Sequence, residues 1–383
     1  MRRSFLPTHA LWLLAACAVG CDDADGGTSA VDAAPINDAF IGQPDCGCDD
    51  LDATRDAEVF PPDTGPAPDT TVPDTSVPDA TPPDTGADPD TGADPDAGPP
   101  PTTIYAPCDP ALRVGGFVAS LEDGYTAVQG QVYNSAAPSQ QAVQTAVDGP
   151  CELLQPPSFF CDPGCAVGST CGPAGCVPLP TAVSVGSVTV AGLAAPVAMN
   201  ANAPVYFYTN RAALPHPGFA EGAALALAAT GAEPVAAFSL QGQGVAPLTT
   251  EGFLVDLAPG AAPHLRWTAP APGTASQIRV DLNIANHGGT PARIECVVPD
   301  TGTYDMPVGL TDQLLAIGAS GFPRVILTRE TVDSVATAVG CVDFRVQSAV
   351  VLDVQIPGLT SCSLDEDCPV DQTCGPDLTC VGG

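Results

Sequence analysis

The chain has 383 residues and carries 44 acidic side chains against 11 basic ones, which gives a formal net charge of −33 at pH 7. Such an acidic surface repels phosphate backbones and anionic lipid headgroups, so nucleic acid is not expected as a partner. The sixteen cysteines predict an exported protein with disulfide bonds, because thiols in the cytosol stay reduced.

The N-terminus has the layout of a bacterial lipoprotein signal peptide, predicted over residues 1–20. Two arginines follow Met1, an apolar run comes next, and small residues lead into Cys21. We predict lipidation at Cys21, because this site leaves fourteen cysteines that can pair completely. Cys17, which also follows small residues, is the alternative lipidation site, and an ordinary cleaved signal is the other alternative.

A lipid on Cys21 would anchor the mature chain in the bacterial cell envelope, and we expect the outer membrane or cell surface rather than the inner membrane. Further along the sequence, we find no run of about 18 consecutive apolar residues, the length that spans a bilayer. The lipid is therefore the only membrane anchor that the sequence predicts.

Residues 21–106 are predicted to be a disordered acidic tether rich in Pro, Asp and Thr. Between 22 and 100 there are nineteen Asp, one Glu and one Arg, and a Pro-Asp-Thr or Pro-Asp-Ala unit recurs. Prolines favour an extended chain and the aspartates repel one another, so no core can form. Cys46 and Cys48 also lie here. A bridge between them would be strained, which leaves intermolecular pairing or metal capture as alternatives.

From residue 107 onward the pattern is all-β, because short apolar runs alternate with Gly, Pro, Asn and Asp. Asp123-Gly124 predicts a hairpin turn. This part of the chain, about 250 residues, is long for a single sandwich, so we predict two β-sandwich-like domains, 107–245 and 246–358. The expected strands are 116–121, 125–133, 183–193, 205–208, 224–229, 235–240, 253–257, 265–268, 278–284, 293–298, 325–329 and 342–356.

One helix is expected in the second domain. Pro307 suits a first helical position, and three leucines then fall on one face before Gly318. Trp267 lies in a strand whose neighbours are apolar or small, so we predict a core residue rather than a platform for a ligand.

Two short cysteine-rich modules are predicted, an insert at 161–176 and a C-terminal module at 359–383. Both contain the pattern C-x-V-x-x-T-C-G-P, in Cys165–Pro173 and Cys368–Pro376. Segments this short cannot bury enough apolar area, so disulfides must stabilise them. Zinc is the alternative, which the cysteine spacing and the absence of interleaved histidines disfavour.

We expect the first cysteine of each module to pair with the third, and the second with the fourth. Outside the modules, we expect Cys296 to pair with Cys341 and Cys108 with Cys151. Four cysteines allow three connectivities, so the other pairings stay open. The pairs expected within the modules are Cys161–Cys171, Cys165–Cys176, Cys362–Cys374 and Cys368–Cys380.

Three features together resemble the secreted, disulfide-rich surface lipoproteins of high-GC Gram-negative bacteria. They are the signal peptide that ends before a cysteine, the Asp-Pro-Thr tether and the run C-x5-C-P-x-x-x-T-C. This resemblance covers the signal, the tether and the two modules. It implies a surface or interaction protein of a family whose function is unknown. No functional residues follow from it.

We predict no catalytic residues, no metal site and no cofactor. Asn286-His287-Gly288-Gly289 faintly resembles an oxyanion-hole motif, with Ser320 as an imagined nucleophile and Asp300 as its partner. The sequence has no G-x-S-x-G elbow, however, and a tight turn explains the glycines better. No group of His, Asp or Glu has the spacing of metal ligands.

The sequence therefore predicts a lipoprotein anchored in the cell envelope that acts as a binding or structural surface protein. Its expected partners are the membrane, through the lipid, and an unknown protein or polysaccharide. The alternative is a hydrolase or lyase of unrecognised type that acts on envelope polymers, which two carboxylates in a cleft would favour.

Overall fold

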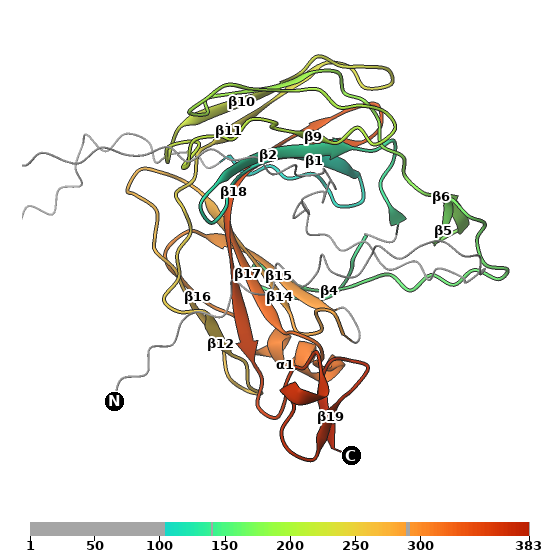
Figure 1. Ribbon diagram of the computed structural model, residues 1–383, viewed down its shortest axis with the longest axis vertical. Coiled ribbons are helices and arrows are strands. Elements are labelled where there is room, and N and C mark those ends of the chain that lie inside the picture. The colour runs from blue at the N-terminus through green and yellow to red at the C-terminus, as the bar shows by residue number, and fades with distance from the viewer. Residues whose placement is uncertain (1–103, 139–140, 289–291, 383) are drawn as a thin grey trace, which may run out of the picture. The chain divides into compact units, whose positions relative to one another are not determined.

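The computed structural model describes residues 104–138, 141–288 and 292–382 (Figure 1). The predicted signal peptide, the lipidation sites Cys21 and Cys17, the tether up to residue 103, Cys46 and Cys48 lie outside these residues. The described part contains twenty strands and a single α-helix, which confirms the predicted all-β class.

The main sheet has ten strands in the order β3-β4-β15-β14-β17-β18-β1-β2-β9, with β12 pairing with β18. Its centre is the long hairpin of β17 and β18, and β1 and β12 run parallel to successive parts of β18. The strands are β1 (Arg113–Leu121), β2 (Thr126–Val132), β3 (Val143–Asp148), β4 (Cys151–Gln155), β9 (Tyr208–Thr209), β12 (Leu254–Asp256), β14 (Gln277–Asn283), β15 (Arg293–Pro299), β17 (Arg324–Ala336) and β18 (Cys341–Gln355).

A second sheet of four strands packs on one end of the main sheet, where Figure 1 shows β10 and β11 above β1 and β2. Its order is β11-β10-β7-β8. The two sheets enclose the first core, in which Phe117, Tyr208 and Phe344 are fully buried. The strands are β7 (Val188–Ala191), β8 (Val197–Met199), β10 (Ala224–Ala229) and β11 (Phe238–Gln243).

The second core lies on β14, β15, β17 and the second half of β18. Helix α1 (Val308–Ile317) and the strand pair β13 (His264–Arg266) and β16 (Thr303–Asp305) contribute to it. The helix forms where the sequence predicted it and ends before Gly318, its C-cap. Pro307 is the N-cap, one position before the first helical position that was expected for it. Trp267 is buried in this core, which confirms its predicted role.

Each expected strand overlaps an observed one but differs from it in its bounds, and the structure also has β3, β4, β8 and β16, which the sequence did not predict. The hairpin turn at Asp123-Gly124 joins β1 to β2, and Gly124 has φ +84°. Two expected strands are much shorter: 183–193 contains only β7, and 205–208 contributes only Tyr208 to β9. Tyr206 has φ +46°, which turns the backbone out of the extended conformation.

Both cores share one sheet. The buried residues of the first core lie before or at Val245 in the sequence, except for those of β18. The buried residues of the second core lie at or after Leu248, except for those of β4. The expected boundary at 245/246 falls between them, yet β4 joins the second core and the first half of β18 joins the first. All described residues consequently belong to one compact unit.

The folded part begins earlier than the expected residue 107. Tyr105 forms a parallel bridge to Val332 of β17. The amide of Ala106 donates to the carbonyl of Val332 at 2.8 Å, and the amide of Val332 donates to the carbonyl of Ile104 at 2.9 Å. This short extension occupies the edge of β17 beyond the end of β14.

Both four-cysteine modules are small β-hairpins with the predicted pairing. Their strands are β5 (Ser169–Gly172) and β6 (Gly175–Pro178) in the first, and β19 (Gln372–Cys374) and β20 (Cys380–Gly382) in the second. In both modules, the Cα atoms of the two bridged cysteines are 5.8 Å apart in the first disulfide and 5.5 Å apart in the second. The observed disulfides are Cys161–Cys171, Cys165–Cys176, Cys362–Cys374 and Cys368–Cys380.

The sequence repeat is also a structural repeat. The amide of Ser169 donates to the carbonyl of Ala166 at 3.0 Å, and the amide of Gln372 donates to the carbonyl of Pro369 at 3.1 Å. The third residue of each turn has positive φ, +83° at Gly168 and +68° at Asp371. Glycine and aspartate both tolerate this conformation, so two different residues support the same turn.

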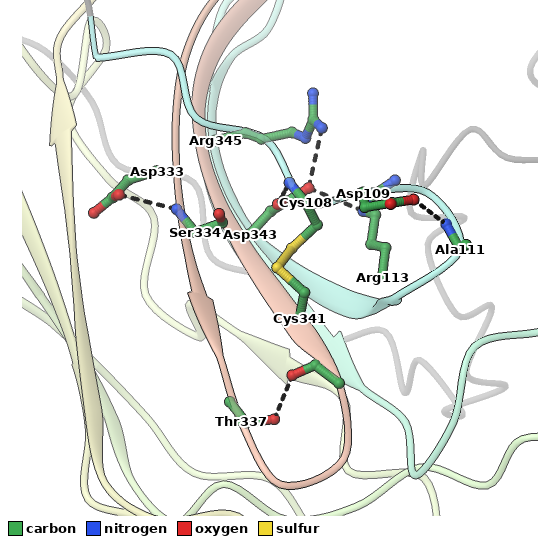
Figure 2. Close-up of a disulfide and its surroundings, with 11 residues drawn as sticks. Cys108, Asp109, Ala111, Arg113, Asp333, Ser334, Thr337, Cys341, Asp343 and Arg345 are labelled. Carbon is green, nitrogen blue, oxygen red and sulfur yellow. Dashed lines mark hydrogen bonds and ion pairs between the residues drawn. A yellow bond between two sulfur atoms is a disulfide. The ribbon is translucent and has the colours of Figure 1, made fainter.

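The predicted pairing of the other four cysteines is wrong. Cys108 pairs with Cys341, and Cys151 pairs with Cys296, with Cα separations of 5.7 and 4.0 Å. Cys151 lies directly opposite Cys296 because β4 pairs with β15. Cys108 meets Cys341 because β1 runs parallel to β18 from its first residue (Figure 2). These contacts follow from the strand order, which the sequence did not reveal.

We expect the double substitution Cys108→Ala/Cys341→Ala to lower the free energy of unfolding by about 4 kcal/mol, because this bridge closes a long loop of the unfolded chain. The matched control is Cys161→Ala/Cys171→Ala, whose bridge spans 10 residues within one module. Urea unfolding followed by tryptophan fluorescence measures both. Equal losses in the two variants would contradict this account of the long bridge.

Candidate functional site

Two networks of buried charges meet at β17. Arg329 and Glu330 are neighbours in the strand, so their side chains point to opposite faces of the sheet. Their exposed fractions are 1% and 0%. Since a buried charge is tolerated only with partners, the contacts of these two residues show what holds the sheet to its surroundings.

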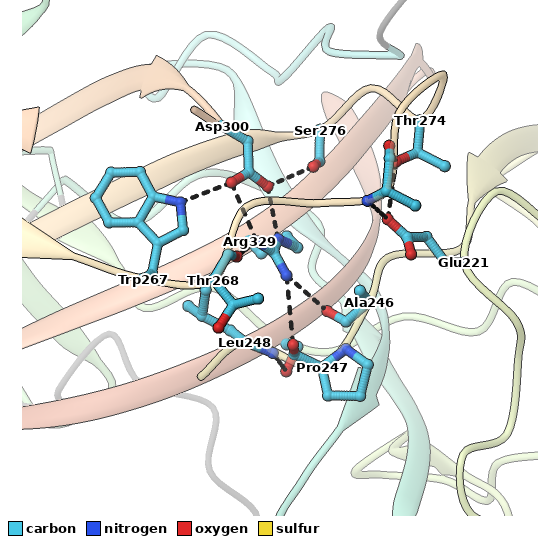
Figure 3. Close-up of polar contacts among 12 residues, drawn as sticks. Glu221, Ala246, Pro247, Leu248, Trp267, Thr268, Thr274, Ser276, Asp300 and Arg329 are labelled. Atoms are coloured by element: carbon cyan, nitrogen blue, oxygen red, sulfur yellow. Dashed lines mark hydrogen bonds and ion pairs between the residues drawn. The ribbon is translucent and has the colours of Figure 1, made fainter. Parts of the chain in front are cut away.

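The first network is centred on Arg329, whose guanidinium forms a two-point ion pair with Asp300 (Figure 3). Nε lies 2.6 Å from Oδ2 and one terminal nitrogen 3.1 Å from Oδ1. The remaining N–H groups donate to the backbone carbonyls of Ala246 and Pro247, at 3.4 and 3.3 Å, and of Thr268. Arg329 therefore fixes the segment that links the two cores.

Asp300 is fully engaged in the same network. Besides Arg329, it accepts hydrogen bonds from the indole N–H of Trp267 at 2.7 Å and from the hydroxyl of Ser276 at 2.6 Å. With both oxygens bound, this carboxylate is a structural acceptor. The imagined partnership of Asp300 with Ser320 and His287 is not present: Ser320 is buried beside the β14–β15 turn, which contains His287 as expected.

The second network is centred on Glu330. Its carboxylate accepts from Nε of Arg279 at 3.2 Å, from Arg345 at 3.0 Å and from the hydroxyl of Tyr105 at 3.3 Å. Arg345 also donates to Asp343 at 3.0 Å. The network thereby connects β14, β17 and β18 to the chain that precedes β1.

Asp343 extends this network to the Cys108–Cys341 disulfide (Figure 2). One oxygen accepts the amide of Cys108 at 2.8 Å, and the other lies 3.0 Å from Nε of Arg113. Cys108 is therefore fixed to β18 twice, through its side chain by the disulfide and through its backbone amide by Asp343. Both contacts lie where residues 104–108 join the sheet.

The electrostatics of the second network favour its charged form. Burial by itself raises the pKa of Glu330, but Arg279 and Arg345 outweigh it and hold that pKa below its ordinary value. Burial works against the charge of Arg345 as well, yet Glu330 and Asp343 raise its pKa. Burial and the nearby carboxylate of Glu330 also raise the pKa of Tyr105, which stays a neutral donor.

Further carboxylates form a row on the polar face of the main sheet. Glu152, Glu295 and Asp281 are cross-strand neighbours on β4, β15 and β14. Arg293 lies 3.3 Å from Asp281 and 3.9 Å from Glu295. A hydrolase needs two carboxylates that flank an open substrate site. Here one arginine lies within ion-pair range of both carboxylates and offsets part of the repulsion between like charges on neighbouring strands.

Asp281 has a raised pKa within this row. Burial is the main cause, Arg293 works against it, and the like charge of Glu295 adds to it. The charged form of Asp281 is therefore disfavoured in the folded protein, in contrast to that of Glu330.

The strand pair β13–β16 brings a histidine of β13 next to an acid and a hydroxyl of β16. Asp305 contacts Nδ1 of His264, and Oγ1 of Thr303 lies 3.4 Å from Nε2. The threonine hydroxyl donates instead to the carbonyl of Leu265 at 3.2 Å, and all three side chains lie at the surface. The carbonyl of Leu265 thus competes with the imidazole for the threonine proton, and the contact with the imidazole is the longer of the two.

Clusters of possible metal ligands within the described residues consist of disulfide cysteines, in one case with Asp343. Sulfur atoms in a disulfide are not thiolates, so these clusters do not support the zinc alternative.

No protein-family model matches the chain, and comparison with curated proteins and with solved structures found no match.

We expect Glu330→Gln to lower the free energy of unfolding by about 3–5 kcal/mol at pH 7, because two arginines lose their buried counter-charge. The pKa of Glu330 is lowered by folding, so its contribution is present above the unfolded pKa of about 4.3 and is lost as pH falls through the folded pKa. Urea unfolding at pH 7 and below pH 4 should show the difference shrinking in acid. A difference that does not depend on pH would contradict this sign.

Asp281→Asn should behave oppositely. Folding raises the pKa of Asp281, so its favourable contribution is present below the unfolded pKa of about 3.9 and is lost as pH rises through the folded pKa. We expect the variant to match the wild type near pH 3 and to have a higher unfolding midpoint at pH 7. A lower midpoint at pH 7 would mean that the ion pair with Arg293 outweighs burial.

Proposed function

We propose that the chain is a lipoprotein anchored through Cys21 in the bacterial cell envelope, and that its folded part is a binding or structural protein at the surface. The partner is a protein or a polysaccharide. The observation that carries this proposal is the use of the buried charges: in the described residues they join strands, loops and the entry of the chain into one rigid scaffold. A rigid scaffold suits the presentation of loops to a partner.

The six disulfides among the described residues indicate an extracellular or otherwise oxidising compartment. No helix within the described residues is long and apolar enough to cross a membrane.

The two modules support a role in contacts. Val167 and Val370 occupy equivalent positions in the repeat, and their exposed fractions are 106% and 91%. A valine that is exposed at the same turn in both modules contributes nothing to either core. Its side chain is available to a partner in both places.

We expect Cys21→Ala to release the protein from the membrane fraction, because the thiol of Cys21 is the proposed site of the lipid. Metabolic labelling with a palmitate analogue, followed by fractionation, measures both the label and the location. The matched variant Cys17→Ala should stay labelled and sediment with membranes. Label that persists in Cys21→Ala and disappears in Cys17→Ala would move the site to Cys17.

A further inference from the structure

A surface cavity of about 290 Å³ lies between the end of β8 and β9. It occupies much of the segment that the sequence predicted as a strand at 205–208. Neither the charged networks nor the modules include its residues. Those that matter most to its chemistry are Asn200, Asn202, Val205, Phe207, Thr209 and Arg211.

Tyr208 anchors the chain segment that lines the cavity, because its own side chain is fixed in the core. Its ring packs edge-on against Phe117 with centroids 5.6 Å apart, and its hydroxyl accepts the amide of Val185 at 2.9 Å and donates to the carbonyl of Gly186 at 3.0 Å. Successive side chains of an extended segment point to opposite sides. Since Tyr208 points into the core, Phe207 and Thr209 point outward, where both line the cavity.

Two asparagine side chains, Asn200 and Asn202, also line the cavity. The hydroxyl of Ser187 donates to Oδ1 of Asn200 at 2.6 Å, which fixes this side chain and leaves its N–H₂ group as the donor. The amide of Tyr206 donates to the carbonyl of Asn202 at 2.9 Å and closes the loop between these two residues. The side chain of Gln131 donates to the carbonyl of Val205 and ties this loop to β2.

The charge around the cavity differs from that of the rest of the chain. In a protein with 44 acidic residues, no Asp or Glu occurs between Asp162 and Glu221, and Arg211 is the only arginine in this interval. The Arg211 side chain is exposed, lines the cavity and has no ion pair with another described residue. Arg211 is therefore the only charged residue among those that line the cavity, and its positive charge favours an anionic ligand although the whole protein is strongly acidic.

We propose that this cavity binds a carboxylated sugar, namely a uronic acid unit of a polysaccharide. The guanidinium of Arg211 suits a carboxylate, which it can bind through two parallel hydrogen bonds. The amides of Asn200 and Asn202 and the hydroxyl of Thr209 suit ring hydroxyls, and the half-buried Phe207 offers an apolar face to the sugar ring. The volume is at the lower end of small-molecule sites, which run from roughly 300 to 1,000 Å³, and fits a single sugar unit.

This inference rests on the proposed surface-binding function and names its partner class. The test uses the full lipoprotein in detergent micelles and isothermal titration calorimetry. The probe is trigalacturonate, and maltotriose is the neutral sugar of equal length. We expect trigalacturonate to bind at least about tenfold more tightly than maltotriose, with an affinity that falls as salt is added, because a charge-assisted contact is lost in the neutral sugar.

Arg211→Gln should weaken trigalacturonate binding about tenfold and leave the weak maltotriose binding unchanged. The matched control is Arg266→Gln, which removes another exposed arginine, one that lies 3.8 Å from Glu251 and outside the cavity. Unchanged urea midpoints in both variants show that the fold is intact. Phe207→Ala should weaken both sugars, because the ring contact does not depend on charge.

No binding of trigalacturonate by the wild type, equal binding of the two sugars, or equal losses in Arg211→Gln and Arg266→Gln would each overturn the proposal. These outcomes are distinct from a failure of the anchoring proposal. Fractionation of Cys21→Ala tests the anchor, and the calorimetry does not depend on which cysteine carries the lipid.

Discussion

The buried arginine at position 329 is the constraint on which the arrangement of the two cores depends. Its guanidinium sits at the centre of the main sheet and binds one carboxylate and three backbone carbonyls. Two of these carbonyls, of Ala246 and Pro247, belong to the segment between the cores. An arginine buried in this way must have every partner in place, because an unpaired charge in the interior is far less stable than in water. The ion pair with Asp300 thus favours a single relative arrangement of sheet and loops.

On the other face of the sheet, Glu330 and Asp343 do the same for the N-terminal entry of the chain. Tyr105 binds Glu330, and the amide of Cys108 binds Asp343 beside the disulfide to Cys341. If the preceding residues form the proposed tether, a force applied from the membrane acts on the folded part at this junction. The hydrogen bonds, ion pairs and disulfide found there attach it to the two longest strands of the sheet.

The buried charged groups thus stabilise the fold, whereas the segment that lines the cavity differs in containing no acidic residue. A chain that places acids almost everywhere else has none between Asp162 and Glu221, and this interval includes most of the first module and the residues that line the cavity. Exposed Val167 and exposed Arg211 lie in this interval. Contact surfaces of a surface protein are expected where the general repulsion is weakest.

Local features were predictable from the sequence because local forces decide them. The hairpin turn at Gly124, the helix after Pro307 and the pairing within each module depend on neighbouring residues, and the structure has all of them. The bridges of Cys108 and Cys151 were not predictable, because they depend on which strands are adjacent. An alternating strand pattern gives the buried face but not the neighbouring strand. The cavity and both charge networks likewise join residues that are distant in sequence, so only the tertiary structure brought them together.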